Sequence, residues 1–154
     1  MLVQLLVGLL VSAIAIMIHA LATVGAIGVA RVAGRRNAPW PRLHLMSVMV
    51  ATVLVLMLAH TIEVVIWSLS YALVGAAPEG SDLLYFAFVN YTTLGYGDVT
   101  PVKAWQLLGP MAAMNGILMF GWSTAVLFEV LLKTIEHLGA IAAPGTPFSV
   151  EDRG

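Results

Sequence analysis

Three long apolar runs divide the chain, and each is long enough to cross a membrane. The first extends from Met1 to about Ala30 without a single Lys, Arg, Asp or Glu, the second covers about 45–74, and the third about 105–135. A hydrocarbon core about 30 Å thick requires roughly 20 apolar residues in a helix. Each run therefore predicts a transmembrane helix, with tilt taking up the extra length. A cleavable signal peptide is the alternative for the first run, but it would need a positively charged start.

Polar segments with helix breakers separate these runs. Residues 31–44, RVAGRRNAPWPRLH, hold four of the seven basic residues together with a glycine and two prolines, which predicts a loop. Residues 81–92, SDLLYFAFVNYT, are too short to span and predict a short helix. Ser81 is its expected cap, and Asp82 suits the positive N-terminal end of that helix. The tail at 139–154 is rich in Gly, Ala and Pro, and we expect it to be loose.

The distribution of arginines predicts how the chain lies in the membrane. Lys and Arg accumulate in short cytoplasmic loops, so the loop at 34–44 and its flanking arginines are expected inside. This orientation places the N-terminus outside, the segment at 75–104 outside, and the C-terminus in the cytoplasm.

Composition agrees with an integral membrane protein and excludes several functions. Hydrophobic residues make up 60% of the chain and charged residues only 10%, with a mean hydropathy of +0.96. Three spans leave no room for a soluble catalytic domain within 154 residues. The net charge of -1 argues against nucleic-acid binding, and the absence of cysteine excludes thiolate chemistry. We expect lipids as neighbours, with no cofactor and no small-molecule substrate.

The stretch YTTLGYGD, which follows the predicted short helix, is unusual in so apolar a chain. Gly95 and Gly97 can adopt positive φ, so successive carbonyl groups can turn toward one axis. Non-helical backbone at membrane depth persists only where protein or a water-filled path satisfies it, which predicts a re-entrant segment. One chain supplies one wall of a carbonyl-lined path, so identical chains must surround the axis, and a filter of this kind uses four.

These residues carry a resemblance to a known family. The motif TLGYGD at 93–98 resembles the selectivity filter of potassium channels, and Pro101 and Trp105 resemble the outer end of the family's inner helix. Gly116 and Gly121 fall where that helix carries a hinge glycine and a second small residue. The order of outer helix, pore helix, filter and inner helix matches a small bacterial two-helix pore module.

This resemblance implies an all-α membrane protein that conducts potassium passively as a homotetramer, in the bacterial plasma membrane. It divides the chain into an additional N-terminal helix at 1–33, a basic loop at 34–44, a pore module at 45–138 and the tail at 139–154. The permeant potassium ion is the only bound species expected.

The resemblance also implies roles for individual residues. The backbone carbonyls at 93–96 bind potassium, with the Thr93 hydroxyl completing the inner site. The residues expected to support the filter are Thr92, Tyr85, Gly97 and Asp98. Leu94 replaces the usual valine, and Tyr85 and Phe86 replace two tryptophans, which alters the aromatic cuff around the filter. The Tyr85 hydroxyl can still donate a hydrogen bond to Asp98.

An ionisable pair lies in the second run, where charge is costly and usually faces protein or water. His60 and Glu63 stand three residues apart, and Trp67 and Tyr71 continue the same helix face. The pair is either a structural hydrogen-bond network, with Tyr71 and Asn115 as expected partners, or a proton-sensitive gate.

Three further positions in the spans carry open alternatives. Glu129 either pairs with Lys133, one helical turn away, or contributes to a cation ring at the inner mouth. Gly116 and Gly121 serve either as a hinge or as close-packing positions. His19 stands alone in the first run and is expected to be structural.

Three function classes follow from the sequence. The first is a potassium-selective channel, and the second is a non-selective or non-conducting channel-like subunit. The third is an intramembrane enzyme using His60 and Glu63, which lacks the second histidine of the H-E-x-x-H zinc pattern. We therefore expect a protein that is not an enzyme.

Overall fold

The computed structural model describes residues 1–34 and 40–142, and this part of the chain is helical without strands. Three of its helices are long and apolar enough to cross a membrane. They confirm the predicted class of an all-α membrane protein. In chain order the elements are α1 (Leu2–Gly34), α2 (Pro41–Val74), α3 (Leu83–Tyr91), the short 3-10 turn η1 (Lys103–Trp105) and α4 (Leu108–Ala142).

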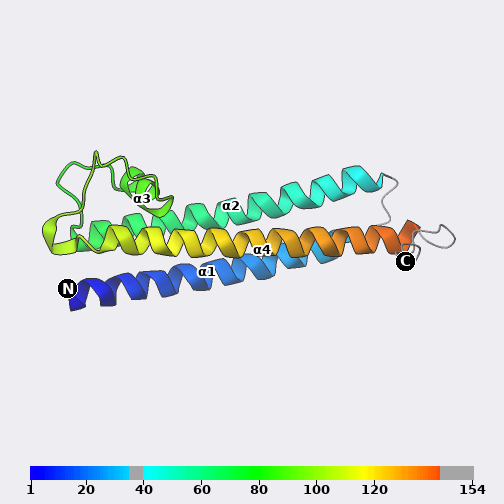
Figure 1. Ribbon diagram of the computed structural model, residues 1–154, viewed down its shortest axis with the longest axis horizontal. Helices are drawn as coiled ribbons and strands as arrows, with labels where there is room; N and C mark the ends of the chain where they lie inside the picture. The colour runs from blue at the N-terminus through cyan, green and yellow to red at the C-terminus, as the bar shows by residue number, and fades with distance from the viewer. Residues whose placement is uncertain (35–39, 143–154) are drawn as a thin grey trace, which may run out of the picture.

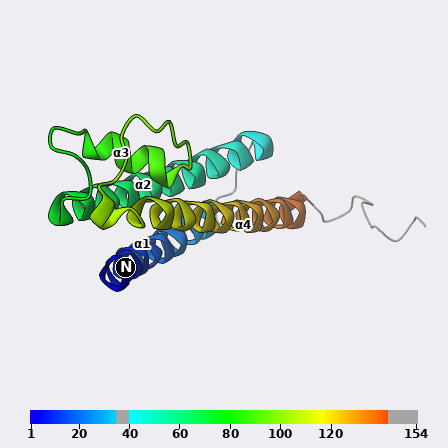
Figure 2. The ribbon, with the colours of Figure 1, turned by 60° about the vertical axis from the view of Figure 1, so that its left-hand side comes forward.

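The long helices lie lengthwise beside one another, and in Figure 1 α4 runs between α2 above and α1 below. Helix α1 contacts both α2 and α4, while α3 contacts the same two helices from the other side (Figure 2). The N-terminus and α3 lie at the same end of the molecule, and α4 ends at the opposite end. The chain therefore crosses the bundle three times, and the short α3 re-enters from one end only.

The start of α2 shows why this helix is longer than the sequence predicted, and Gly75 shows why it ends at Val74. Pro41 occupies its first turn, where a fixed φ is favourable and no amide hydrogen is needed, so 41–44 are helical although we expected a loop. At the other end Gly75 has a φ of +64°, and the Ala76 amide donates to the Tyr71 carbonyl at 2.9 Å. Arg35 and Arg36 of the predicted loop lie outside the described residues.

Helix α4 is also longer than predicted, because it continues to Ala142 and so includes the first residues of the expected loose tail. No proline follows Pro110, in the first turn of α4, until Pro144, and alanine and isoleucine at 140–142 are compatible with a helix. Residues 143–154 of the predicted tail lie outside the described residues.

The cap of α3 differs from the prediction by one residue. Asp82, not Ser81, is the N-cap, and its Oδ1 accepts a hydrogen bond from the Tyr85 amide at 3.0 Å. A carboxylate satisfies a free amide at this position and also interacts favourably with the positive end of the helix dipole. The predicted helix is therefore present, but its cap is the acidic Asp82 and not the expected Ser81.

Two buried clusters hold the helices together. The larger lies toward the α3 end and joins side chains from all four helices, among them Val11, Trp67, Phe86 and Met111. The smaller lies toward the other end and contains Ala26, Val48, Leu56, Val126 and Val130. Within a membrane such contacts stabilise through close packing, because lipid tails are as apolar as the side chains.

Candidate functional site

The TLGYGD stretch follows α3 directly and lies on the surface of the single chain. Leu94 is 53% exposed and Tyr96 is 68% exposed, although both are large and apolar or aromatic. No other described part of the same chain covers them. Leu94 and Tyr96, with Gly95 between them, therefore belong to the exposed surface of the single chain.

Backbone dihedral angles alternate in sign along this stretch. The φ angle is positive at Thr93 (+61°), Gly95 (+58°) and Gly97 (+78°). It is not positive at the intervening residues Leu94 and Tyr96. Thr93 is the one non-glycine residue with positive φ among the described residues. A β-branched side chain disfavours this conformation by roughly 1–3 kcal/mol, so the surrounding structure must impose it, as happens at functional sites.

Hydrogen bonds to the end of α3 fix the direction of the backbone. The Thr93 amide donates to the Asn90 carbonyl at 3.0 Å, and the amides of Leu94 and Gly95 both donate to the Val89 carbonyl, at 3.0 and 3.3 Å. In a trans peptide the carbonyl group points opposite to the amide hydrogen of the same peptide unit. The carbonyl groups of Thr92, Thr93 and Leu94, which belong to the same three peptide units, therefore point away from α3.

Helix α3 also contributes to the electrostatics of the stretch. The negative end of a helix dipole lies at its carboxyl terminus, and α3 ends at Tyr91, immediately before the motif. A cation near the exposed carbonyl groups would thus also experience the negative end of α3.

The outer end of the motif is tied to the start of α3. The Tyr85 hydroxyl donates a hydrogen bond of 2.7 Å to Asp98 Oδ2, as the sequence predicted, and Asp98 Oδ1 accepts from the Val99 amide at 3.0 Å. The bond to Asp98 raises the pKa of the Tyr85 hydroxyl, since ionisation would place two negative charges side by side. The aspartate is therefore held in one orientation despite the altered aromatic cuff.

The two candidate hinge glycines lie in different surroundings. A Cβ atom added at Gly116 would come within 2.0 Å of the Tyr91 carbonyl oxygen, whereas one added at Gly121 would meet nothing within 4 Å. Gly116 thus permits the last turn of α3 to contact α4 at backbone distance. This observation favours the packing interpretation for Gly116 and gives no packing role within the chain to Gly121.

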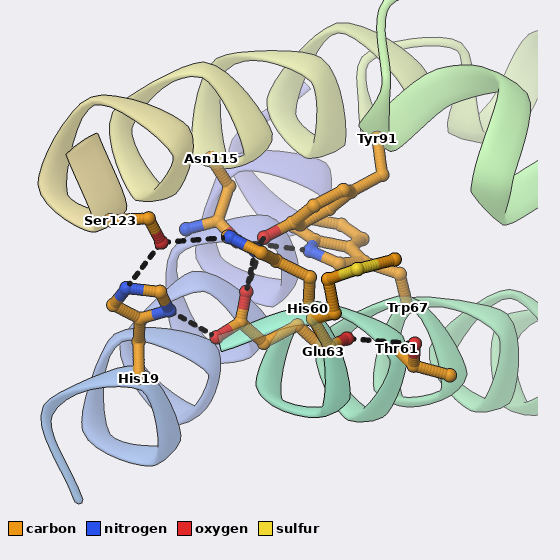
Figure 3. A network of polar contacts seen from close by, with 9 residues as sticks. His19, His60, Thr61, Glu63, Trp67, Tyr91, Asn115 and Ser123 are labelled. Carbon is orange, nitrogen blue, oxygen red and sulfur yellow. Dashed lines mark hydrogen bonds and ion pairs between the residues drawn. The ribbon is translucent and has the colours of Figure 1, made fainter. Parts of the chain in front are cut away.

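Five polar side chains from all four helices meet in the centre of the bundle (Figure 3). His19 Nδ1 lies 2.8 Å from Glu63 Oε1, and His60 Nδ1 lies 3.3 Å from Glu63 Oε2. Tyr91 donates a hydrogen bond to the same Oε2. Ser123 Oγ lies 2.9 Å from His60 Nε2 and 3.3 Å from His19 Nε2. We call these five residues the histidine–glutamate cluster.

Burial separates this cluster from solvent. The side chains of His19 and Glu63 are fully buried, and that of His60 is 15% exposed. His19, His60 and Glu63 each offer one metal-ligating atom within 4.8 Å of the others, so their chemistry would also suit a transition metal. The polar pair predicted from the sequence is thus part of a larger network.

A family model described as "Ion channel" matches residues 47–133, which include most of α2, α3, the motif and most of α4. The chain belongs to this ion channel family. The match confirms the resemblance to the pore-loop family of potassium channels that the motif indicated. No curated protein and no solved structure was found that matches the chain. The additional helix α1 precedes the matched region.

Tyr71 and Asn115 were the partners expected for His60 and Glu63, and this prediction was wrong. Asn115 accepts a hydrogen bond from Trp67 Nε1 at 3.2 Å, and the Tyr71 hydroxyl donates to the Leu108 carbonyl at 3.4 Å. His19, expected to be a lone structural residue, is the partner that the sequence did not assign. A signal was available, because polar residues in neighbouring spans must satisfy one another.

Glu129 forms the predicted ion pair with Lys133, at 2.6 Å between Oε1 and Nζ, and both side chains are half exposed. The two residues also line a cavity of about 240 Å³ together with Ile27, Ala30 and Arg31 of α1. An exposed pair of this kind contributes little to stability. Its place beside α1 supports the ion-pair interpretation, and a ring at the inner mouth stays a prediction.

Proposed function

We propose that four copies of this ion channel chain surround a pore that conducts potassium selectively and passively. In this arrangement the backbone carbonyls at 93–96 bind the ion, and α4 lines the pore below them. The observation that carries the proposal is the alternating sign of φ at 93–97, together with the amides of 93–95 bonded to α3, which turn the carbonyl groups of 92–94 away from that helix. Rings of carbonyl groups can replace the hydration shell of potassium.

Oligomerisation follows from the same geometry. One chain presents a single row of carbonyl groups, and no second copy of the motif exists in the sequence. The exposed side chains of Leu94 and Tyr96 need a cover, and neighbouring subunits around a symmetry axis would provide it. Leu94 is one methylene longer than the valine of the resembling filters, so its fit against a neighbour decides whether the filter keeps its width.

We propose further that the α3 end faces outside and the opposite end faces the cytoplasm. Arg31 and Arg42 lie at the end opposite to α3, close to the connection between α1 and α2. The excess of basic residues in cytoplasmic loops favours this orientation in the plasma membrane.

Reconstitution into liposomes tests the function directly. Potassium and sodium fluxes are compared for the wild-type chain, Gly97→Ala and Gly80→Ala. Both glycines have φ near +80°, and a Cβ atom would meet nothing within 4 Å at either, but only Gly97 belongs to the motif. We expect a potassium preference that is lost in Gly97→Ala and kept in Gly80→Ala, with the mass of a tetramer in all three.

The other outcomes assign different functions. Equal potassium and sodium fluxes in the wild-type chain would indicate a non-selective channel, as Leu94 and the altered cuff allow. A tetramer without flux would indicate a subunit that does not conduct. An unchanged potassium preference in Gly97→Ala would show that this stretch is not the filter.

A further inference from the structure

The histidine–glutamate cluster forms a closed ring of hydrogen bonds in the middle of the bundle. Glu63 connects to both imidazoles through their Nδ1 atoms, and Ser123 connects to both through their Nε2 atoms. Tyr91 completes the ring by donating to the carboxylate, and its oxygen also lies 3.1 Å from His60 Nδ1. The ring thereby joins α1, α2, α3 and α4, so its protonation state affects every helix of the chain (Figure 3).

The hydrogens available to this ring can be counted. Each contact between two electronegative atoms needs a hydrogen. His60 Nδ1 has two contacts, to Glu63 Oε2 and to the Tyr91 oxygen, which share one hydrogen and are counted together. Five contacts then need a hydrogen of their own: two at Glu63 from the imidazoles, one from Tyr91, and two at Ser123. The two hydroxyl groups supply one hydrogen each, and two neutral imidazoles supply one each. With an ionised carboxylate, four hydrogens must therefore serve five contacts.

The missing hydrogen falls at Ser123. If both imidazoles donate from Nδ1 to Glu63, both Nε2 atoms are acceptors, and a single hydroxyl hydrogen can satisfy only one of them. The lone pair of the other Nε2 would then lie opposite a lone pair of the Ser123 oxygen, with no hydrogen between them. An unsatisfied buried polar contact of this kind is unfavourable.

We propose that the histidine–glutamate cluster is a proton-binding site that holds one additional proton. His19, His60 and Glu63 then share three protons, all five contacts contain a hydrogen, and the cluster is electrically neutral. The proton resides on the carboxyl group or on one imidazole, and both arrangements are neutral overall. This inference concerns the chain itself and does not depend on potassium selectivity.

The surroundings of the cluster favour the neutral state. No Lys, Arg or Asp of the part described forms a hydrogen bond or ion pair with it, so nothing there would compensate a net negative charge. Aromatic rings pack against the imidazoles instead, with Trp122 against His19 and Phe120 against His60. Asn115, drawn beside the cluster in Figure 3, is neutral. An uncompensated charge in the middle of a membrane is costly.

His60 is the most exposed of the three titratable residues of the cluster. Its side chain lines a cavity of about 180 Å³ together with Thr61, Phe88, Tyr91 and Phe120. We therefore expect protons to exchange through His60, since the side chains of His19 and Glu63 are fully buried. Because Ser123 belongs to α4, loss of the proton breaks a contact on the helix proposed to line the pore.

The substitution Glu63→Gln provides the test. A carboxamide donates from nitrogen to one imidazole and accepts at oxygen from the other and from Tyr91, so all five contacts are filled with both imidazoles neutral and no charge at position 63. The variant thus mimics the proton-loaded cluster in the alkaline range, where the imidazoles of the variant are neutral. We expect Glu63→Gln to fold and assemble, and the measurement is reversible unfolding in mixed detergent micelles between about pH 7.5 and 9.

The sign of the pH dependence follows from proton counting. Above about pH 7.5 the unfolded chain holds two protons on the three groups, and the folded wild-type cluster holds three. The folded state binds one proton more, so the stability of the wild-type chain falls as pH rises, by about tenfold in the unfolding equilibrium per pH unit. In Glu63→Gln the folded and unfolded chains hold equal numbers of protons on these residues. The stability of this variant therefore no longer falls as pH rises in the alkaline range. Other titrating groups are common to both chains and cancel in the comparison.

Two further measurements decide the matter even if the variant does not fold. Imidazole nitrogen NMR and carboxyl infrared spectra of the wild-type chain at pH 8 should show one imidazolium or one protonated carboxyl group. An ionised carboxylate beside two neutral imidazoles would overturn the proposal, as would parallel alkaline dependences in the two chains. One equivalent of a transition metal in the purified protein would also overturn it, because the metal would replace the shared proton.

Discussion

The contact between Gly116 and Tyr91 joins the pore helix α3 to α4 at backbone distance. A Cβ atom at position 116 would lie 2.0 Å from the Tyr91 carbonyl oxygen, 3.0 Å from its carbonyl carbon and 3.2 Å from Cδ1 of its ring. The first two of these atoms belong to the backbone, so no side-chain rotation can relieve the overlap. We therefore predict that Gly116→Ala displaces the carboxyl end of α3.

The structure gives the size of this displacement. Moving the Tyr91 oxygen from 2.0 Å to an ordinary contact of 3.4 Å requires a shift of about 1.4 Å. Inserting one methyl group into a packed interior costs about 1–3 kcal/mol, and a backbone neighbour places the cost toward the upper end of that range. Since the motif begins two residues after Tyr91, the shift also moves the proposed filter. We expect a loss of about 2–3 kcal/mol in stability and a reduced flux.

Gly121→Ala is the matched control, because a Cβ atom there meets nothing within 4 Å. Replacing a helical glycine by alanine stabilises a helix by about 0.5–1 kcal/mol, so this variant should be as stable as the wild-type chain or slightly more so. Both variants are unfolded in mixed micelles and followed by circular dichroism. Equal stability of Gly116→Ala and the wild-type chain, with altered flux alone, would refute the packing argument and support a hinge.

Two predictions concern the outer end of the bundle and its orientation. Tyr85→Phe removes the hydroxyl that orients Asp98, and we expect a weaker potassium preference in the liposome assay; unchanged selectivity would mean that the bond is incidental. The bond raises the pKa of Tyr85, so the stability that the bond contributes is present below about pH 10 and is lost as pH rises through the elevated pKa. Ultraviolet titration of tyrosinate can follow this loss. The chain has no cysteine, so Glu79→Cys should react with an impermeant reagent added outside intact cells and Glu136→Cys should not. The reverse labelling pattern would invert the proposed orientation.

The sequence by itself determined the spans, the short re-entrant helix and the class of the fold. Each of these features depends on local properties: the length of an apolar run, a glycine or proline that ends it, and an acidic residue at a helix start. The Tyr85–Asp98 bond was also predictable, because the short separation between these residues and the family resemblance bring them together. The Glu129–Lys133 pair was predictable because one helical turn separates the two residues.

Only the tertiary structure decided which residues meet across helices. His19 and Glu63 are 44 positions apart, and their contact depends on the rotation of α1 about its own axis. The first run leaves that rotation undetermined, because apolar residues occupy nearly all sides of the helix it forms. The same holds for Ser123, for the partners of Tyr71 and Asn115, and for the absence of space at Gly116. The pattern along one helix indicates which side chains must be buried. The packing of neighbouring helices determines which residues those side chains contact.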